Sequence, residues 1–297
     1  MSKKWIGNLM LLLASMIWGA AFVAQTEAMK YTGPFTFQAT RFFLGGLVLL
    51  PVIAVMDKRG NPKKPVTKEA KKYQLFAGII CGLILFAACS PQQLGLMLQL
   101  PAGKSGFITS LYIILVPIFG LFLGKKLRPW VWLSVALALF GLYMLCGMGG
   151  FSLNMGEGLT LICAVAFTFH ILFIDHVSPR VDGVRLSCLQ FFTCGAISLV
   201  IALILEQPGL DSLLRCWLPI AYTGIFSSGV AYTFQIVGQG YTEPTTASLL
   251  MSLESVFSAV FGWLLINQAL SGWELLGCVL VFAGVLIAQL PERKKLT

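Results

Sequence analysis

Apolar residues fill long stretches of this chain, and short polar breaks separate them. A helix needs about 20 mostly apolar residues to cross the roughly 30 Å hydrocarbon layer of a bilayer. Ten such stretches follow one another, at residues 6–26, 34–56, 73–97, 102–123, 129–147, 156–175, 184–205, 216–238, 245–267 and 272–290. The connectors are too short to form a separate soluble domain. The pattern therefore predicts an all-α polytopic membrane protein with ten transmembrane helices.

Composition supports the prediction of a membrane protein and argues against a soluble one. Of the 297 residues 57% are hydrophobic and only 11% are charged, which does not fit a soluble surface. The start "MSKKWIGNLMLLLASMIWGAAF" begins like a signal peptide, but its apolar run continues past any plausible cleavage site and nine more stretches follow. We expect an uncleaved first helix.

The eight cysteines lie in or beside apolar stretches without C-x-x-C spacing, which favours small apolar residues over disulfides or zinc ligands.

The positions of the basic residues explain the net charge of +9. If both termini are cytoplasmic, 17 of the 21 Lys and Arg residues fall on the cytoplasmic side. The other side carries only Lys30, Lys104 and Arg215, and Arg41 lies inside a span. Cytoplasmic loops of membrane proteins carry such an excess of basic residues. We therefore predict a multi-pass protein of the cell (cytoplasmic) membrane with both termini cytoplasmic, and no nucleic-acid partner is needed to explain the charge.

The chain contains a weak internal repeat. Residues 95–145 align without a gap on 238–288, with identical residues at nine of 51 positions and with Pro101 over Pro244 at the start of a span. Earlier in each half, "RFFLGG" (41–46) aligns with "QFFTCG" (190–195) at a shift of 149. The repeat predicts two homologous halves, residues 1–150 and 151–297.

Each half contains five predicted spans, and five is an odd number. The second copy must then enter the membrane upside down relative to the first, which gives the inverted repeat found in many secondary transporters. Such a repeat places a cavity near the bilayer midplane, where alternating access can expose it to either side. The lipid bilayer and a small-molecule solute are the partners that this arrangement predicts.

In order and spacing the chain resembles the EamA-type permeases of the drug/metabolite transporter superfamily. The likeness rests on "ASMIWGAAF", Arg41, "FITSLYIILVPIFG", "SLESVFSAVFGWLL" and "ALSGWELLGCVLVFAGVLI". The sequence departs from the family where Ser255, in place of the usual Pro, follows Glu254. Gln268 replaces an acidic residue near the end of that span, and Lys125 stands at the equivalent place in the first half. The resemblance implies ten helices around a central cavity.

Several polar and aromatic residues are candidates for that cavity. The resemblance implies that the third and eighth helices line it, and these helices carry Gln92, Gln93, Tyr232 and Gln235. Gln92 and Gln235 are separated by the repeat shift of 143. Together with Tyr232, Trp18 would give the cavity aromatic walls suited to flat or apolar solutes. Both aromatic residues also fit plain helix packing.

Glu254 is the most conspicuous candidate. If its helix starts at Pro244, Glu254 lies about 15 Å along the axis, close to the centre of the layer. A charge there costs at least about 3 kcal/mol, so such a residue normally faces a partner, a water-filled cavity or a substrate path. The interpretation is that Glu254 binds the solute or couples its transport to a proton or another ion. A protonated or hydrogen-bonded glutamate that only holds helices together is the structural alternative.

Two further ionisable residues lie inside spans. Arg41 is about 10 Å below the outer surface, where it would neutralise an acidic group of a solute, pair with a carboxylate such as Glu27, or extend outward to water. His170 lies deep in the sixth span, and its protonation would affect coupling unless it is an ordinary hydrogen-bonded helix contact. Asp175 and His176 sit at the end of that span without a further ligand, so no metal is predicted.

The sequence favours a secondary transporter of a metabolite, amino acid or drug-like solute. "GKS" at 103–105 lacks the earlier glycine of a phosphate loop, so no ATP-driven pump and no cofactor are expected. No H-E-x-x-H or G-x-S-x-G motif indicates an enzyme. The alternative is a non-transporting structural or receptor-like membrane protein. Two G-x-x-x-G motifs, at 78–82 and 120–124, fit helix contacts within the bundle and leave the oligomeric state open.

Overall fold

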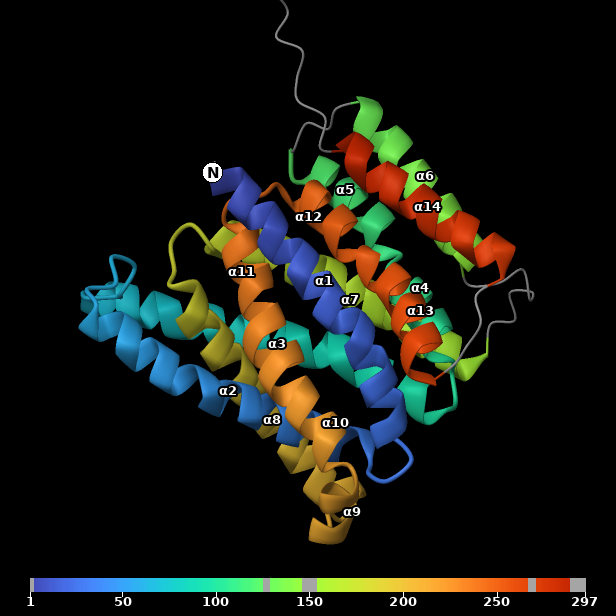
Figure 1. The fold of residues 1–297 in the computed structure, drawn as a ribbon. Coiled ribbons are helices and arrows are strands. Elements are labelled where there is room, and N and C mark those ends of the chain that lie inside the picture. Colours follow the sequence, from blue (N-terminus) through green and yellow to red (C-terminus); the bar gives the residue numbers. More distant parts are fainter. Residues whose placement is uncertain (1–2, 125–128, 146–153, 267–270, 289–297) are drawn as a thin grey trace, which may run out of the picture.

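The computed structural model describes residues 3–124, 129–145, 154–266 and 271–288, and the described residues contain helices and no strand. The helices form a bundle in which many neighbouring helices run side by side (Figure 1). Some residues discussed in the sequence analysis lie outside the described part of the chain. These are Lys125, Lys126, Arg128, Gln268 and the basic residues 293–295. The prediction of an all-α protein is confirmed.

The element bounds follow the predicted apolar stretches closely. The first half contains α1 (Lys3–Ala28), α2 (Pro34–Lys58), α3 (Lys68–Met97), α4 (Ala102–Thr109), α5 (Tyr112–Phe122) and α6 (Pro129–Leu145). The second half contains α7 (Met155–Val177), α8 (Gly183–Leu205), α9 (Leu210–Arg215), α10 (Trp217–Tyr222), the π-helix η1 (Thr223–Tyr232), α11 (Thr233–Gln239), α12 (Pro244–Met251), α13 (Leu253–Ile266) and α14 (Gly272–Ala288).

Local sequence explains where these helices begin. Pro34 and Pro244 occupy the first turn of α2 and α12, where a missing N–H costs nothing. The side chains of Thr67, Asn154 and Asp182 accept hydrogen bonds from the first-turn N–H groups of α3, α7 and α8. The breaks between apolar stretches therefore contain the residue types that satisfy exposed helix ends.

Three predicted spans are not regular helices. The span at 102–123 is interrupted between Thr109 and Tyr112, and the span at 245–267 is interrupted at Ser252. The span at 216–238 has a π-helical middle, η1, whose wider turn is often found at functional sites. The expectation of continuous α-helix was wrong at these places. A run of apolar residues indicates the length of a span, but it does not reveal where the backbone hydrogen bonds within that span change register.

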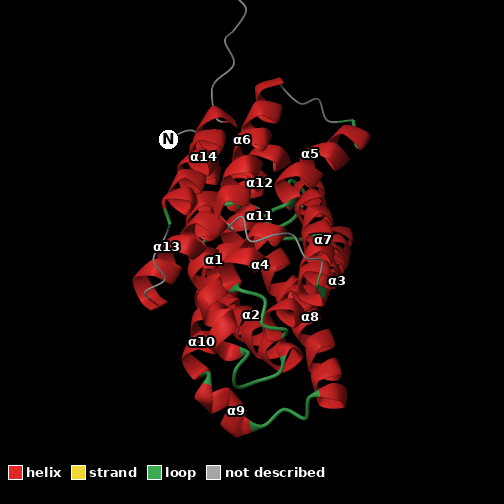
Figure 2. Cartoon of the chain, turned by 90° about the vertical axis from the view of Figure 1, so that its right-hand side faces the viewer, coloured by secondary structure: helices red, strands yellow, loops and turns green. Residues whose placement is uncertain are grey.

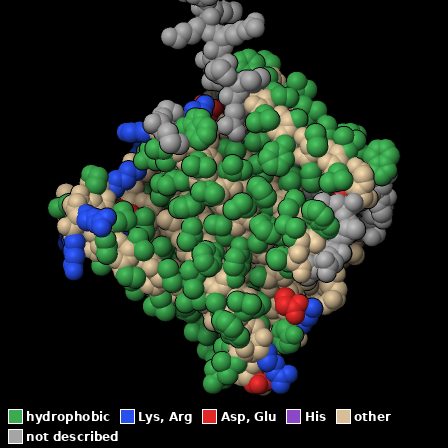
Figure 3. Space-filling model, in the orientation of Figure 1, with side chains coloured by type: hydrophobic (Ala, Val, Ile, Leu, Met, Phe, Trp, Pro, Cys, Tyr) green, Lys and Arg blue, Asp and Glu red, His purple; other side chains and the backbone are tan. Residues whose placement is uncertain are grey.

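Seven helical stretches, including α4 with α5 and α12 with α13, are long and apolar enough to cross a membrane, within the described part of the chain. Two more apolar helices, α6 and α14, are shorter, and α10, η1 and α11 follow one another without a gap. Hydrophobic side chains cover the face of the molecule seen in Figure 3, while Lys and Arg gather at its left and lower margins. The chain is a multi-pass membrane protein. The count of ten helices in two inverted sets stays a prediction.

The helices pack in pairs that join the two halves of the chain. α2 lies along α8, α3 packs on both α7 and α8, and α1 packs on α13, η1 and α11. α6 and α14 lie against each other at one end of the bundle (Figures 1 and 2). Residues far apart in sequence are thus brought together along the middle of the bundle.

Glu206 ties the end of α8 to the start of α2. Its carboxylate accepts hydrogen bonds from the backbone N–H groups of Phe35 at 2.9 Å and Thr36 at 2.7 Å, and from the Thr36 hydroxyl at 2.7 Å. A carboxylate at a helix N-terminus is favoured by the free N–H groups and the helix dipole.

We therefore expect Glu206→Ala to lower the free energy of unfolding by about 2 kcal/mol. Thermal unfolding of the purified protein in detergent measures this loss as a lower Tm. Asp211→Ala is the matched control, because Asp211 is 80% exposed in its pair with Arg215 and should contribute almost nothing. Equal melting temperatures for Glu206→Ala and wild type would show that the tie does not stabilise the bundle.

Candidate functional site

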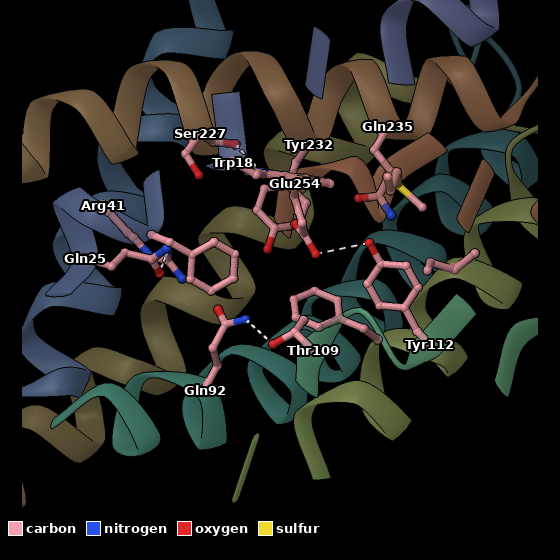
Figure 4. A pocket seen from close by; sticks show the side chains of 14 residues that line it. Trp18, Gln25, Arg41, Gln92, Thr109, Tyr112, Ser227, Tyr232, Gln235 and Glu254 are labelled. Carbon is pink, nitrogen blue, oxygen red and sulfur yellow. Dashed lines mark hydrogen bonds between the residues drawn. The ribbon is translucent and has the colours of Figure 1, made fainter. Parts of the chain in front are cut away.

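A cavity lies where both halves of the chain meet in the middle of the bundle (Figure 4). The empty space between its wall residues, counted together with space open to solvent, is about 450 Å³. Helices α1 to α5, α7, η1 and α11 to α13 each contribute at least one wall residue. The lining residues are Trp18, Phe22, Gln25, Arg41, Gln92, Thr109, Tyr112, Phe167, Ile171, Ser227, Tyr232, Gln235, Met251 and Glu254.

Arg41 reaches this cavity from α2 and is only 2% exposed. Its Nη1 donates a hydrogen bond to Gln25 Oε1 at 3.0 Å, and its guanidinium lies 4.6 Å from the Phe42 ring centroid. Nε and Nη2 have no hydrogen-bond partner among the described residues. The expected alternative partner Glu27 instead contacts Lys30 and Tyr31, so Arg41 neither pairs with Glu27 nor extends to water. Burying a cation without an ionic partner carries a large desolvation free energy, so an anionic group of a solute would be favoured beside it.

Glu254 enters the cavity from the first turn of α13 and is 5% exposed. The Tyr112 hydroxyl donates a hydrogen bond to Glu254 Oε1 at 3.1 Å. Across the described part of the chain, neither Glu254 nor Arg41 takes part in a salt bridge. In Figure 4, Glu254 lies between the Arg41–Gln25 pair and Tyr112. The cavity thus holds a cationic and an acidic group that do not neutralise each other.

Four more of the sequence candidates line the same space. The ring centroids of Trp18 and Tyr232 are 4.8 Å apart in an edge-on arrangement, and Trp18 Nε1 donates to the Ser227 carbonyl at 3.3 Å. Gln92 Nε2 donates to Thr109 Oγ1 at 3.0 Å. Gln235 is 2% exposed, and its Oε1 has no partner among the described residues. Trp18, Gln92, Tyr232 and Gln235 therefore give the cavity aromatic walls and amide groups.

Gln93 and His170 are not among the lining residues. Gln93 is fully buried and its Nε2 lies 3.5 Å from Met29 Sδ. His170 is also fully buried, with Nε2 3.0 Å from Gln190 Oε1 and 3.4 Å from Cys81 Sγ. This geometry matches the hydrogen-bonded helix contact that the sequence left open for His170. Both residues are buried, but the position of a residue along a helix does not say which way its side chain faces.

The sequence interpretation missed several lining residues. Gln25, Thr109 and Tyr112 are polar residues of ordinary appearance, and nothing in their immediate surroundings marks them. A usable signal existed in the repeat, because Phe167 lies 149 positions after Trp18 and Ile171 lies 149 positions after Phe22. Applying the shift to the candidate Trp18 would have identified Phe167, whereas Phe22 was itself missed.

The chemistry of this arrangement is that of a binding cavity. It offers a guanidinium with N–H groups that have no partner among the described residues, a carboxyl group, three amides and aromatic walls. This suits a small solute with polar ends and an apolar body. Among the described residues, no group of three or more His, Cys, Asp or Glu side chains could hold a metal ion.

Comparison with known proteins identifies the kind of molecule. The family model described as "EamA-like transporter family" matches residues 5–147 and again residues 154–289. A protein of Archaeoglobus fulgidus named as an uncharacterized transporter is 29% identical over 97% of this chain and 87% of its own length. The inner membrane transporter YedA of Escherichia coli K12, also named as uncharacterized, is 24% identical over 92% of this chain and 87% of its own length.

Two other proteins extend the comparison. A WAT1-related chloroplast protein of Arabidopsis thaliana is 26% identical over 93% of this chain and 67% of its own length. One solved crystal structure shares the fold with a TM-score of 0.77 and 23% identity, and the match covers 95% of this chain and 96% of that one. The resemblance seen in the sequence is confirmed. The chain belongs to the EamA-like transporter family and is a membrane transporter.

Proposed function

We propose that this chain is a secondary transporter that moves a small metabolite, amino acid or drug-like solute across the cytoplasmic membrane. It would do so by alternating access around the central cavity, with residues 1–150 and 151–297 as inverted five-helix repeats. The observation that carries the proposal is the central cavity, lined by both halves, in which the buried Arg41 and Glu254 lack ionic partners among the described residues. A solute that satisfies these groups would be bound specifically near the middle of the bundle.

The contact between α2 and α8 supports the inverted repeat. The ring centroids of Phe42 and Phe191 are 5.6 Å apart, and those of Phe43 and Phe192 are 6.1 Å apart. Each pair is separated by 149 positions, the shift that aligns "RFFLGG" with "QFFTCG". Residues related by a two-fold axis meet each other only where that axis passes. Both pairs are therefore expected to lie on the pseudo-two-fold axis of the protein.

The two ends of this helix pair support the same axis. At one end Glu206, the residue that follows α8, binds Thr36 in the first turn of α2. At the other end Asp57, in the last turn of α2, binds Arg185 in the first turn of α8. Asp57 and Glu206 are 149 positions apart, as are Thr36 and Arg185. One carboxylate contact thus has its repeat-related counterpart at the opposite end of the pair.

A difference between the halves supports alternating access. α1 packs closely on α13 at Gly19, where a Cβ atom would lie 2.8 Å from the backbone nitrogen of Ser258. The counterpart pair, α7 with α5, makes less extensive contact, and the residue that corresponds to Gly19 there is Thr168. An inverted repeat can exchange the arrangements of its two halves. We propose that α7 closes on α5 when α1 and α13 separate.

The orientation in the membrane has its own test. A single reactive cysteine introduced at exposed Lys63, in the segment between α2 and α3, should react with a membrane-impermeant maleimide only when the cytoplasmic face is accessible. Labelling would be compared in intact cells and inverted vesicles, with peptide mapping to distinguish the native cysteines. Clear labelling from outside intact cells would overturn the cytoplasmic placement of this segment and of both termini.

The experiment that tests the function is solute counterflow in vesicles reconstituted with the purified protein. A thermal-shift screen of amino acids, metabolites and drug-like compounds first selects solutes that stabilise the protein. Each hit is then measured for counterflow with and without a pH gradient. Accumulation of at least one labelled solute, above that in protein-free vesicles, supports secondary transport. Vesicles that retain folded protein yet show no counterflow for any hit would contradict it.

A further inference from the structure

The two interrupted helices face each other beside the cavity. α12 packs on α5, and α13 packs on α4. The Ser255 hydroxyl donates a hydrogen bond to the Gly106 carbonyl at 3.0 Å and lies 2.7 Å from the Ser110 hydroxyl. Because the single hydrogen of Ser255 is used by Gly106, Ser110 is the donor in the second bond. One helix interruption from each half of the chain is thus joined to the other by a short chain of hydroxyl groups.

Tyr112 forms the next link between the same two interruptions. It is the first residue of α5, it is 3% exposed, and its hydroxyl donates to Glu254 Oε1. A phenol has one hydrogen to donate, so it holds one carboxylate oxygen and leaves the other unbound by it. Figure 4 shows the bond to Tyr112 on one side of Glu254 and the cavity on the other. The Ser110 hydroxyl also lies beside this carboxyl group.

We propose that Tyr112 is a positioning residue for Glu254, and that it sets the carboxyl group so that Oε2 faces the cavity. This inference rests on the proposed transport function, because it assigns Glu254 to the site that binds or couples solute. Tyr112 belongs to the first half of the chain and Glu254 to the second. The orientation of the carboxyl group therefore depends on a hydrogen bond between the first residue of α5 and the first turn of α13. When the halves rearrange, the same bond transmits the change to the cavity.

A solute-independent probe tests this role. Dicyclohexylcarbodiimide is an apolar reagent that adds to protonated carboxyl groups. The rate of its reaction with Glu254 therefore reports the fraction of molecules in which this carboxyl group is protonated. The Tyr112 O–H stabilises the ionised carboxylate, and a hydrogen bond to a charged group is worth about 1.5–3 kcal/mol. We expect Tyr112→Phe to raise the rate of modification at Glu254 by about tenfold in alkaline buffer, where most wild-type molecules carry the ionised carboxylate. Mass spectrometry of the peptide that contains Glu254 measures the rate in the full-length protein in vesicles.

Two controls separate positioning from general loosening of the helices. Ser255→Ala deletes a hydroxyl at the same junction, next to Glu254 in sequence, and should leave the rate unchanged. Replacement of Tyr112 by 4-aminophenylalanine keeps the ring and restores a donor, so it should bring the rate back toward wild type. An unchanged rate in Tyr112→Phe contradicts the proposal. An equal increase in Ser255→Ala, or no recovery with the amino analogue, contradicts it as well.

The probe also distinguishes this inference from the proposed function. Modification of Glu254 requires no transport, so failure of counterflow for every solute would leave the carbodiimide result intact. Conversely, counterflow by the wild-type protein together with an unchanged rate in Tyr112→Phe would remove only the positioning role.

Discussion

Glu254→Gln is expected to lower solute flux at least about tenfold while the protein still inserts and folds. Glutamine keeps the volume of the side chain, and its carbonyl oxygen can still accept the hydrogen bond from Tyr112. It cannot carry a negative charge or exchange a proton. The expected loss therefore reports the ionisable group itself and not the packing of α13.

The matched control for this variant is Glu243→Gln. Glu243 precedes α12, eleven positions before Glu254, and is exposed. Counterflow of the same hit solute in both variants, with and without a pH gradient, provides the comparison. If Glu254→Gln shows wild-type flux at every pH tested, the carboxyl group has no role in binding or coupling and only the structural interpretation of this residue remains.

Arg41→Gln should raise the half-saturating concentration of an anionic solute by roughly ten- to hundredfold, because a hydrogen-bonded charge contributes about 1.5–3 kcal/mol. Arg41 Nε and Nη2 are buried without a partner among the described residues, so the solute would supply the acceptor that the protein does not. Arg41 has no ionic partner in the described part of the chain, and removing such a buried cation relieves desolvation, so Tm should not fall. Counterflow at varied solute concentration, together with thermal unfolding, measures both effects.

Arg59→Gln provides the control, since Arg59 is exposed at the end of α2 and far from the cavity lining. It should alter neither affinity nor stability. A lower Tm for Arg41→Gln with unchanged half-saturation would show that Arg41 supports the fold and does not contact solute.

Most of the helical architecture could be predicted because bilayer helices obey a simple length rule. The proline at the start of α2 and α12 and the caps of α3, α7 and α8 mark boundaries that the sequence displays directly. The interruptions near Ser110 and Ser252 could not be read in the same way. Small hydroxyl residues occur in regular membrane helices too, and only their partners across the bundle show that the helix ends there.

The candidate site could be predicted only in part, for a related reason. Arg41 and Glu254 were proposed from charge and depth, whereas Trp18, Gln92, Tyr232 and Gln235 were proposed from the family resemblance. The structure brings all six to one cavity. Gln93 and His170 have the same chemistry at similar depth but point elsewhere, because helix rotation depends on tertiary packing. Tyr112 escaped notice since its importance comes from a residue 142 positions away.

Some residues around the cavity have similar counterparts related by the repeat, and the charged ones do not. Phe42 and Phe43 meet their repeat counterparts, and Gln92 and Gln235 line the same space. The charged groups break this symmetry. Arg41 corresponds to Gln190 at the shift of 149, and Glu254 corresponds to Leu111 at the shift of 143. The scaffold is thus duplicated, whereas each charge belongs to one half only.

The central claim is that the solute binds in the cavity between Arg41 and Glu254. Cryo-electron microscopy of the protein with a counterflow hit, in lipid nanodiscs, tests it most directly. We expect solute density within hydrogen-bond distance of the Arg41 guanidinium or the Glu254 carboxyl group, bordered by the Trp18 and Tyr232 rings. Density for the solute at another place, with this cavity unchanged and empty, would contradict the account.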